Sequence, residues 1–227
     1  MPTYFTPGSF KFLRELAANN ERDWFAANKE RYIDLVQEPA LAFISDFAPR
    51  LRKISSHFEA DPRVQGGSLL RPYRDIRFSK DKTPYKTNVG IRFFHEAGSD
   101  IHAPGFYLHL EPANSYAGVG LWRPEAPVAR QIRQAIVDDP AGWKRAAHGK
   151  AFLSRFTLDG ESLHRPPQGF DPEHPWVEDL KRKDFIAGAR LPDRMVTSEG
   201  FLTEYASLAK ASVPYMRFLT SAMNLAF

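Results

Sequence analysis

The sequence predicts an α+β protein in which N-terminal helices and a C-terminal helix pack on a mainly antiparallel β-meander. Three observations lead to this fold class. Apolar residues in the first 56 positions, and again after about residue 198, recur with the spacing of amphipathic helices. Between residues 68 and 123 the apolar period changes to two, which is typical of strands with one buried face. The connections in this region are short, and short connections favour antiparallel pairing.

Helices are expected at both ends of the chain. The first follows Thr6, which is suited to the N-cap, and Pro7, which is suited to the first helical position. Asn20 is suited to capping a second helix, with the sequence ERDWFAANKERYIDLVQ. The last helix begins near Ser198, and Pro214 should kink it because proline removes a backbone N–H donor.

Four runs of alternating residues predict adjacent antiparallel strands at 73–78, 88–94, 105–111 and 116–122. A further strand is expected at 185–191. Clusters of Gly, Pro, Asn and Ser separate the runs of the meander. The alternation places the following side chains on the face that packs against the helices: Ile76, Phe78, Ile91, Phe93, Leu108 and Leu110.

Length and composition indicate a single domain with a substantial core. The chain has 227 residues, of which 43% are hydrophobic. A chain of this size buries on the order of 70% of the surface that its unfolded form exposes. We expect one α+β domain over residues 1–227, divided into a helical part (1–56), the β-meander (68–123) and a mixed helix and strand part (124–227).

Composition and motifs also exclude several classes of function. The sequence contains no cysteine, so disulfides, thiolate metal sites and cysteine nucleophiles are absent. No stretch approaches the ~18 apolar residues of a membrane span, and the N-terminus lacks the pattern of a signal peptide. The histidines show none of the spacings of metal-binding motifs, and Gly66 and Gly67 lack the spacing of a Walker loop. We expect a soluble, cytoplasmic protein without metal, cofactor or membrane partner, and the sequence leaves its oligomeric state open.

Positive charge is concentrated in RPYRDIRFSKDKTPYK, residues 71–86, which we call the basic segment. It holds six Lys and Arg residues and two Asp residues, a net charge of +4. The net charge of the whole chain is also +4, so the rest of the sequence is balanced. The strand predicted at 73–78 leads into a turn that Pro84 stiffens, and we expect a hairpin tip rich in cations.

The leading hypothesis for the basic segment is an anion-binding site for a phosphate- or carboxylate-bearing small molecule. Arginine offers a planar fork that fits either anion, and lysine offers a point charge. His109 lies in the run YLHLEP of a neighbouring strand. The alternation places it on the same face as Tyr107 and Glu111, where it can join the cations across the sheet. The candidate ligand-binding residues are Arg74, Arg77, Lys80, Lys82, Lys86 and His109.

A structural ion-pair network is the alternative for the same charges. On this interpretation Asp75 is largely buried and bonded to at least one arginine, because an unpaired buried carboxylate is costly. Two carboxylates cannot neutralise six cations, so further partners are required. The nearest in sequence are Glu96, Asp100 and Glu111.

Two other functions remain open from the sequence. Asp75, Asp81, Lys82 and Tyr85 place acidic, basic and electrophilic groups close together, which permits catalysis, although no motif assigns a reaction. Aromatic residues alternate with the Lys and Arg residues, and this permits a nucleic-acid-binding or protein-interaction module. A surface that binds nucleic acid needs basic side chains distributed along many phosphates. Here the Lys and Arg side chains are concentrated in one segment, so nucleic acid is the less favoured partner.

The string RDIRFSKDKTPYKTNVG carries a resemblance to a known family. Together with NNERDWFAANKERY before it, and with GFYLHLEP, GVGLW and RPPQGFDPEHPWVEDLKRKDF after it, the chain resembles the domain of unknown function 2461 family of bacterial and fungal proteins. The resemblance covers essentially the whole chain. It implies an α+β fold with a helical N-terminal part, and it implies no activity, substrate or catalytic residue.

Overall fold

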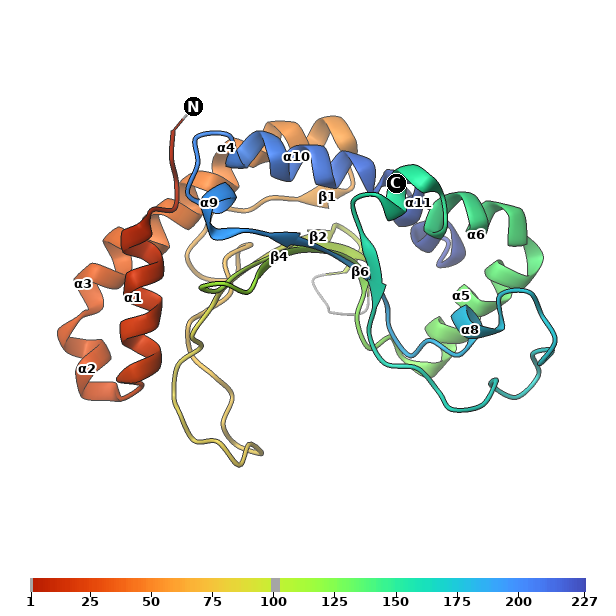
Figure 1. Cartoon of the computed structure of the whole chain (residues 1–227), viewed down its shortest axis with the longest axis horizontal. Coiled ribbons are helices and arrows are strands. Elements are labelled where there is room, and N and C mark those ends of the chain that lie inside the picture. The colour runs from red at the N-terminus through yellow and green to blue at the C-terminus, as the bar shows by residue number, and fades with distance from the viewer. Residues whose placement is uncertain (1, 99–102) are drawn as a thin grey trace.

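An antiparallel sheet forms the centre of the molecule (Figure 1). The computed structural model describes residues 2–98 and 103–227, and within these residues the sheet has six strands in the order β1-β2-β3-β4-β6-β5. The predicted α+β class is therefore confirmed. The strands are β1 (Phe58–Glu59), β2 (Val89–His95), β3 (Gly105–Leu110), β4 (Ser115–Leu121), β5 (Thr157–Asp159) and β6 (Phe185–Leu191).

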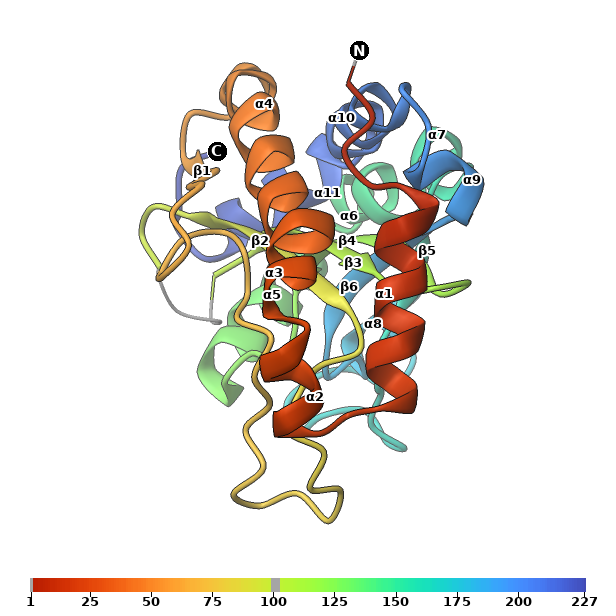
Figure 2. The ribbon, with the colours of Figure 1, turned by 90° about the vertical axis from the view of Figure 1, so that its left-hand side faces the viewer.

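Helices precede the meander and follow it, as the sequence predicts. Figures 1 and 2 show α4 and α10 side by side along one face of the sheet, while α1, α2 and α3 descend beside one end of it. No helix in the described ranges is long and apolar enough to cross a membrane. The helices are α1 (Pro7–Ala18), α2 (Arg22–Ala27), α3 (Lys29–Tyr32), a π-helical turn η1 (Ile33–Gln37), α4 (Glu38–Ile54), α5 (Ala126–Asp138), α6 (Pro140–Ala147), α7 (Lys150–Leu153), α8 (Val177–Leu180), α9 (Asp193–Val196), α10 (Phe201–Ala211) and α11 (Val213–Ala222).

Local sequence determines where the terminal helices begin and end. The side chain of Thr6 accepts a hydrogen bond from the N–H of Gly8, and Ser9 completes a capping box at the start of α1. At the other end of the chain, Ser212 separates α10 from α11. Pro214 lies in the first turn of α11, where its missing N–H costs little. The predicted N-cap is confirmed, whereas the predicted kink at Pro214 is replaced by a break at Ser212 between two separate helices.

Aromatic side chains join the helices to one face of the sheet. The ring of Phe93 on β2 lies 4.7 Å from that of Phe47 on α4 and 5.9 Å from that of Tyr205 on α10, measured between centroids. Phe43 of α4 packs at 5.2 Å on Phe201 of α10. The strand residues predicted for this face in β2 and β3 are at most 1% exposed, namely Ile91, Phe93, Leu108 and Leu110. This packing buries the β2 and β3 side chains on this face of the sheet.

The basic segment is not a strand, which corrects the prediction for residues 73–78. Its two ends pair at the base through a bridge between Tyr73 and Tyr85. Backbone hydrogen bonds from Arg74 N to Pro84 O (2.9 Å) and from Lys86 N to Pro72 O (2.7 Å) flank this bridge. Beyond the base, the carboxylates of the segment bond to its own backbone N–H groups and replace the ladder that a hairpin needs. The segment therefore extends from the sheet as a loop (Figures 1 and 2).

The burial predicted for three residues of the basic segment is wrong for the same reason. Phe78 is 95% exposed, and Ile76 is only partly buried. Asp75 is exposed as well, although the predicted bond to an arginine exists, because Arg77 donates to both of its carboxylate oxygens. An alternating pattern predicts a buried face only where the strand reaches a neighbour, and this segment extends past the sheet.

We expect Phe78→Ala to change the free energy of unfolding by less than ~0.5 kcal/mol, because an exposed side chain has no packing to lose. Phe93→Ala should lower it by ~3–5 kcal/mol, because that ring is enclosed by aromatic neighbours. Chemical denaturation of both variants measures the difference. A large loss for Phe78→Ala would show that the loop packs on the sheet in solution.

Candidate functional site

The second face of the sheet is partly exposed and carries polar and aromatic side chains. Alternate residues of the strands point to this open face, and antiparallel register aligns them in rows across the sheet. One row is Gly90, His109, Tyr116 and Arg190, and the next is Arg92, Tyr107, Gly118, Gly188 and Thr157. The open face therefore brings together residues from five strands.

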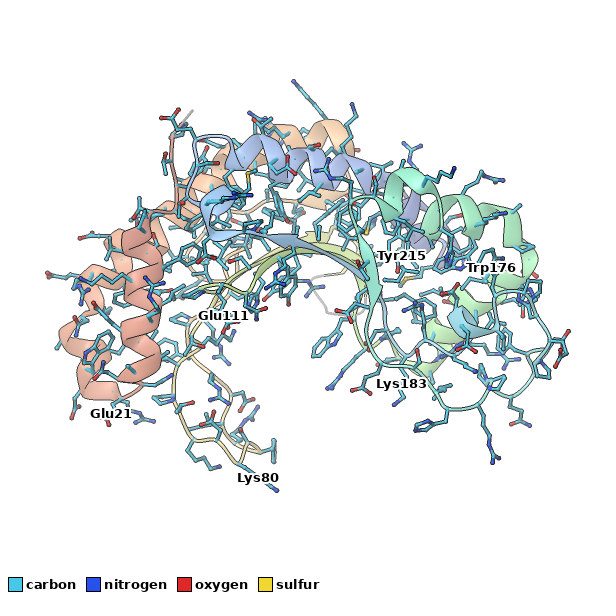
Figure 3. The ribbon with its side chains drawn as sticks, viewed as in Figure 1. Glu21, Lys80, Glu111, Trp176, Lys183 and Tyr215 are labelled. Atoms are coloured by element: carbon cyan, nitrogen blue, oxygen red, sulfur yellow. The ribbon has the colours of Figure 1, made fainter. Side chains whose placement is uncertain are left out.

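A cavity of about 440 Å³ lies between the base of the basic segment and the open face, and we call it the basic cavity. Its lining residues are Leu70, Arg74, Asp75, Lys86, Asn88, Gly90, Tyr107, His109 and Tyr116. Figure 3 shows Glu111, the neighbour of these strand residues, beside the sheet, with Lys80 far away at the end of the loop. The basic segment thus contributes its base, and not its tip, to the cavity.

The structure divides the six predicted ligand-binding residues into two groups. Arg74, Lys86 and His109 line the basic cavity. The other three do not line it and lie farther out on the loop: Arg77, Lys80 and Lys82. The ammonium of Lys82 donates a hydrogen bond to Ile76 O at 3.0 Å, which supports the turn.

Of the four residues that the sequence suggested for catalysis, Asp75 alone is among the lining residues of the basic cavity. Tyr85 is buried, with its ring stacked on Phe25 at a centroid distance of 4.0 Å. Asp81 and Lys82 lie on the exposed loop. The four candidates for catalysis, which are close in sequence, are therefore not gathered around one space.

Two ion pairs within the basic segment hold the loop together. The guanidinium of Arg77 donates to Asp75 at 2.9 and 2.7 Å, and this lowers the pKa of Asp75 to about 2. The backbone N–H of Thr83 and the guanidinium of Arg74 both donate to Asp81, and they lower the pKa of Asp81 to about 2. Both carboxylates of the segment are thus committed to cations within it.

Glu96 and Glu111, the two additional carboxylates that the structure describes, bond to histidines and not to the loop. Glu96 accepts a hydrogen bond from His57 at 2.5 Å, and this contact lowers the pKa of Glu96. Glu111 lies 3.3 Å from Nε2 of His109. Asp100, the third expected partner, and His102 lie outside the described residues.

Lys86 has a different environment from the other cations of the segment. It lines the basic cavity and is partly buried, and its ammonium has no hydrogen-bond or ion-pair partner among the residues that the structure describes. Loss of water around the ammonium, and then repulsion from Arg71, lower the pKa of Lys86. An unpaired cation that is partly removed from water favours the arrival of an anion.

A hydrogen-bonded group around His109 forms another wall of the basic cavity. Nδ1 lies 3.3 Å from both Tyr107 Oη and Asn88 Nδ2, and Nε2 lies 3.3 Å from a carboxylate oxygen of Glu111. Burial raises the pKa of Tyr107, so its hydroxyl stays protonated and is a donor. These contacts assign Nδ1 as the acceptor and Nε2–H as the donor to Glu111. The ring of Tyr116 stacks on the imidazole at 4.7 Å and holds its plane.

Asn20 positions the base of the basic segment, a role that the sequence did not suggest. Its amide donates to Tyr85 O at 2.9 Å and accepts from Tyr85 N at 3.0 Å, as a neighbouring strand would. The expected capping role is wrong, because Glu21 is the N-cap of α2 and makes no side-chain cap hydrogen bond. Both bonds act on the residue before Lys86, so Asn20 helps to hold that lysine at the cavity.

The part of the chain that the structure describes contains no group of three or more His, Asp or Glu side chains suited to holding a metal ion. The basic cavity is instead lined by cations, neutral hydrogen-bonding groups and one carboxylate, that of Asp75, which Arg77 holds. A model of the family of conserved hypothetical proteins DUF2461 matches residues 8–218.

The chain belongs to the DUF2461 family. The match covers nearly the whole sequence, and it confirms the resemblance stated from the central string and its neighbours. Comparisons with curated proteins and with solved structures found no match. The description of the family as conserved hypothetical proteins assigns no activity.

Asn20→Ala should lower the free energy of unfolding of this DUF2461 protein by ~1–3 kcal/mol, because a backbone donor and acceptor of Tyr85 lose their partner. Asn19→Ala is the matched control, since the exposed Asn19 side chain bonds only to Glu15 O, at 2.9 Å. Denaturant titration of both variants measures the difference. Equal losses would contradict the role assigned to Asn20.

Lys86→Met should raise the thermal stability of the ligand-free protein, because it keeps the aliphatic stem and removes an unpaired cation. The lowered pKa of Lys86 means that the folded state releases this proton at a lower pH than the unfolded state. Between the lowered pKa and 10.5, the ordinary lysine value, the unfolded state binds more protons, so wild-type stability rises with pH relative to the variant. The difference in the free energy of unfolding between the two proteins should therefore shrink as the pH approaches 10.5.

Denaturant titrations of wild type and Lys86→Met at neutral and alkaline pH measure this gap. Lys82→Met, at an exposed lysine of the same loop, is the control and should give no such gap. A stability difference for Lys86→Met that is constant with pH would show that Lys86 is fully hydrated.

Proposed function

We propose that this protein binds a small anionic molecule, with a phosphate or carboxylate group, in the basic cavity. Lys86 is the principal cationic ligand, Arg74 is the second, and Asn88 and His109 complete the polar lining. The single observation that carries the proposal is the position of Lys86, a partly buried ammonium at a cavity with no partner among the described residues.

The charges around the basic cavity support an anion as the occupant. Asp75 and Asp81 are each held by an arginine of the same loop, so neither is available to neutralise Lys86. A phosphate or carboxylate bound there replaces the hydration that the ammonium has lost, and charge-assisted hydrogen bonds are stronger than neutral ones. The volume of about 440 Å³ is within the range of small-molecule sites, ~300–1,000 Å³. The proposal concerns binding, and no reaction is assigned.

Inorganic phosphate should raise the melting temperature of the wild-type protein above its value in chloride of equal ionic strength, because binding to the native state alone stabilises it. Lys86→Met should abolish this rise. Lys82→Met and Lys80→Met should retain it, since those residues lie outside the basic cavity. Thermal unfolding of the four proteins over a series of phosphate concentrations provides the measurement. An equal rise in wild type and Lys86→Met would refute the proposal.

A nucleic-acid-binding or protein-interaction module is the second candidate, and one observation favours it. Phe78 is 95% exposed, and the guanidinium of Arg77 lies 5.8 Å from its ring centroid. Exposed aromatic and cationic groups on a projecting loop can stack on bases or contact a protein. In this case Phe78→Ala and Lys80→Ala would weaken binding of a fluorescent single-stranded oligonucleotide, while Lys86→Met would leave it unchanged.

The cytoplasmic location expected from the sequence stays a prediction.

A further inference from the structure

A second, larger cavity adjoins the basic cavity on the open face of the sheet. Its volume is about 830 Å³, and we call it the sheet cavity. Three residues line both cavities: Leu70, Tyr107 and Tyr116. The two spaces are therefore neighbours, and a molecule bound at Lys86 has the sheet cavity next to it.

Bare backbone forms the floor of the sheet cavity. Gly118 of β4 is directly opposite Gly188 of β6, and Tyr107 and Thr157 lie on either side of this pair. A Cβ added at Gly188 would have no atom within 4 Å, and one added at Gly118 would make only ordinary contacts of 3.6 Å. Gly120 differs, because its φ of +112° favours glycine.

Neither Gly118 nor Gly188 is required by the backbone. Both lie in strand interiors, where glycine is destabilising by roughly 0.5–1 kcal/mol relative to alanine. Side chains at these two positions would project into the sheet cavity. Their absence leaves a flat surface of peptide groups across two strands.

Aromatic and apolar side chains border this flat floor, and polar groups lie at its rim. Trp122 is 52% exposed, with the guanidinium of Arg123 at 4.7 Å from its ring centroid, and Ile186 also lines the cavity. Thr157 and Asp159 of β5, together with Arg190 of β6, contribute polar groups to the lining. A flat floor of peptide groups between aromatic and apolar side chains, with a polar rim, suits a planar ring with polar edges better than an alkyl chain, whose methylene groups would lie beside charges.

We infer that the ligand carries an aromatic ring next to its anionic group, and that this ring lies on the glycine floor of the sheet cavity. The inference rests on the proposed function, because the anion at Lys86 is what places the ring. Ring faces gain contact area on a flat surface, and the flanking side chains of Tyr107 and Trp122 offer edge contacts. The substrate class is thus an aromatic phosphate or carboxylate.

Phenyl phosphate and cyclohexyl phosphate test the inference, because the two are matched in size and charge and differ in flatness. By isothermal titration calorimetry, the wild-type protein should bind phenyl phosphate about tenfold or more tightly than inorganic phosphate, which is ~1.4 kcal/mol. The gain in affinity over inorganic phosphate should be clearly smaller for cyclohexyl phosphate. Gly188→Leu should reduce the affinity for phenyl phosphate to that for inorganic phosphate and leave the latter unchanged.

Two further variants keep the test interpretable. Gly200→Leu is the matched control, because Gly200 is exposed, lines neither cavity, and a Cβ there would contact only Ser198 Oγ at 3.7 Å. It should bind all three compounds like wild type. Gly188→Ala should give a smaller loss of phenyl phosphate affinity than Gly188→Leu, and it serves as the test if the leucine variant does not fold.

The outcomes separate the inference from the proposed function. Equal affinities for phenyl and inorganic phosphate, or for phenyl and cyclohexyl phosphate, would overturn the aromatic ligand. If Lys86→Met still abolished phosphate binding in that case, the proposed function would stand. Phenyl phosphate binding that depended on Gly188 and not on Lys86 would refute the anion site, and with it the placement of the ring by an anion at Lys86.

Discussion

Packing of α4 and α10 against one face of the sheet is the interaction on which the rest of the molecule depends. The rings of Phe47, Phe93 and Tyr205 close that side to water, and their centroids lie 4.7 to 5.9 Å apart. Because strand side chains alternate, burying one set of residues directs the other set to the opposite face. Tyr107 and His109 are on that face because Phe106, Leu108 and Leu110 are in the core. The hydrophobic core thus determines which polar groups are available for a ligand.

Local pairing determines how the charge of the basic segment is distributed, while its net charge stays at +4. Arg77 and Asp75 are two residues apart and form a bidentate pair, and Arg74 and Asp81 stiffen the same loop. Such exposed pairs contribute little to global stability, about 0–1 kcal/mol. Their consequence is spatial: they hold Asp75 and Asp81 on arginines, and Lys86 is left as the lining cation of the basic cavity that no carboxylate pairs among the described residues.

The sequence predicted the parts of the fold that follow from short-range patterns. Period-two alternation located β2, β3, β4 and β6, and it identified the buried residues Ile91 and Phe93. The same alternation failed at residues 73–78, since a pattern does not reveal whether a strand has a neighbour. The candidate site was predicted in part. Lys86 was among the candidates by its charge, whereas the pairing of Gly118 with Gly188 depends on register and cannot be read from either segment alone.

The contact between Asn20 and Tyr85 has a kinetic consequence. It joins residues 65 positions apart, so the chain must close a long loop before the two hydrogen bonds can form. Contacts of this kind slow folding and tend to form after local helices do. The lysine beside Tyr85 therefore reaches its final place only once the N-terminal helices and the meander have met. We expect chains in which this contact has not formed to lack the complete pocket, so that a ligand binds the fully folded state in preference.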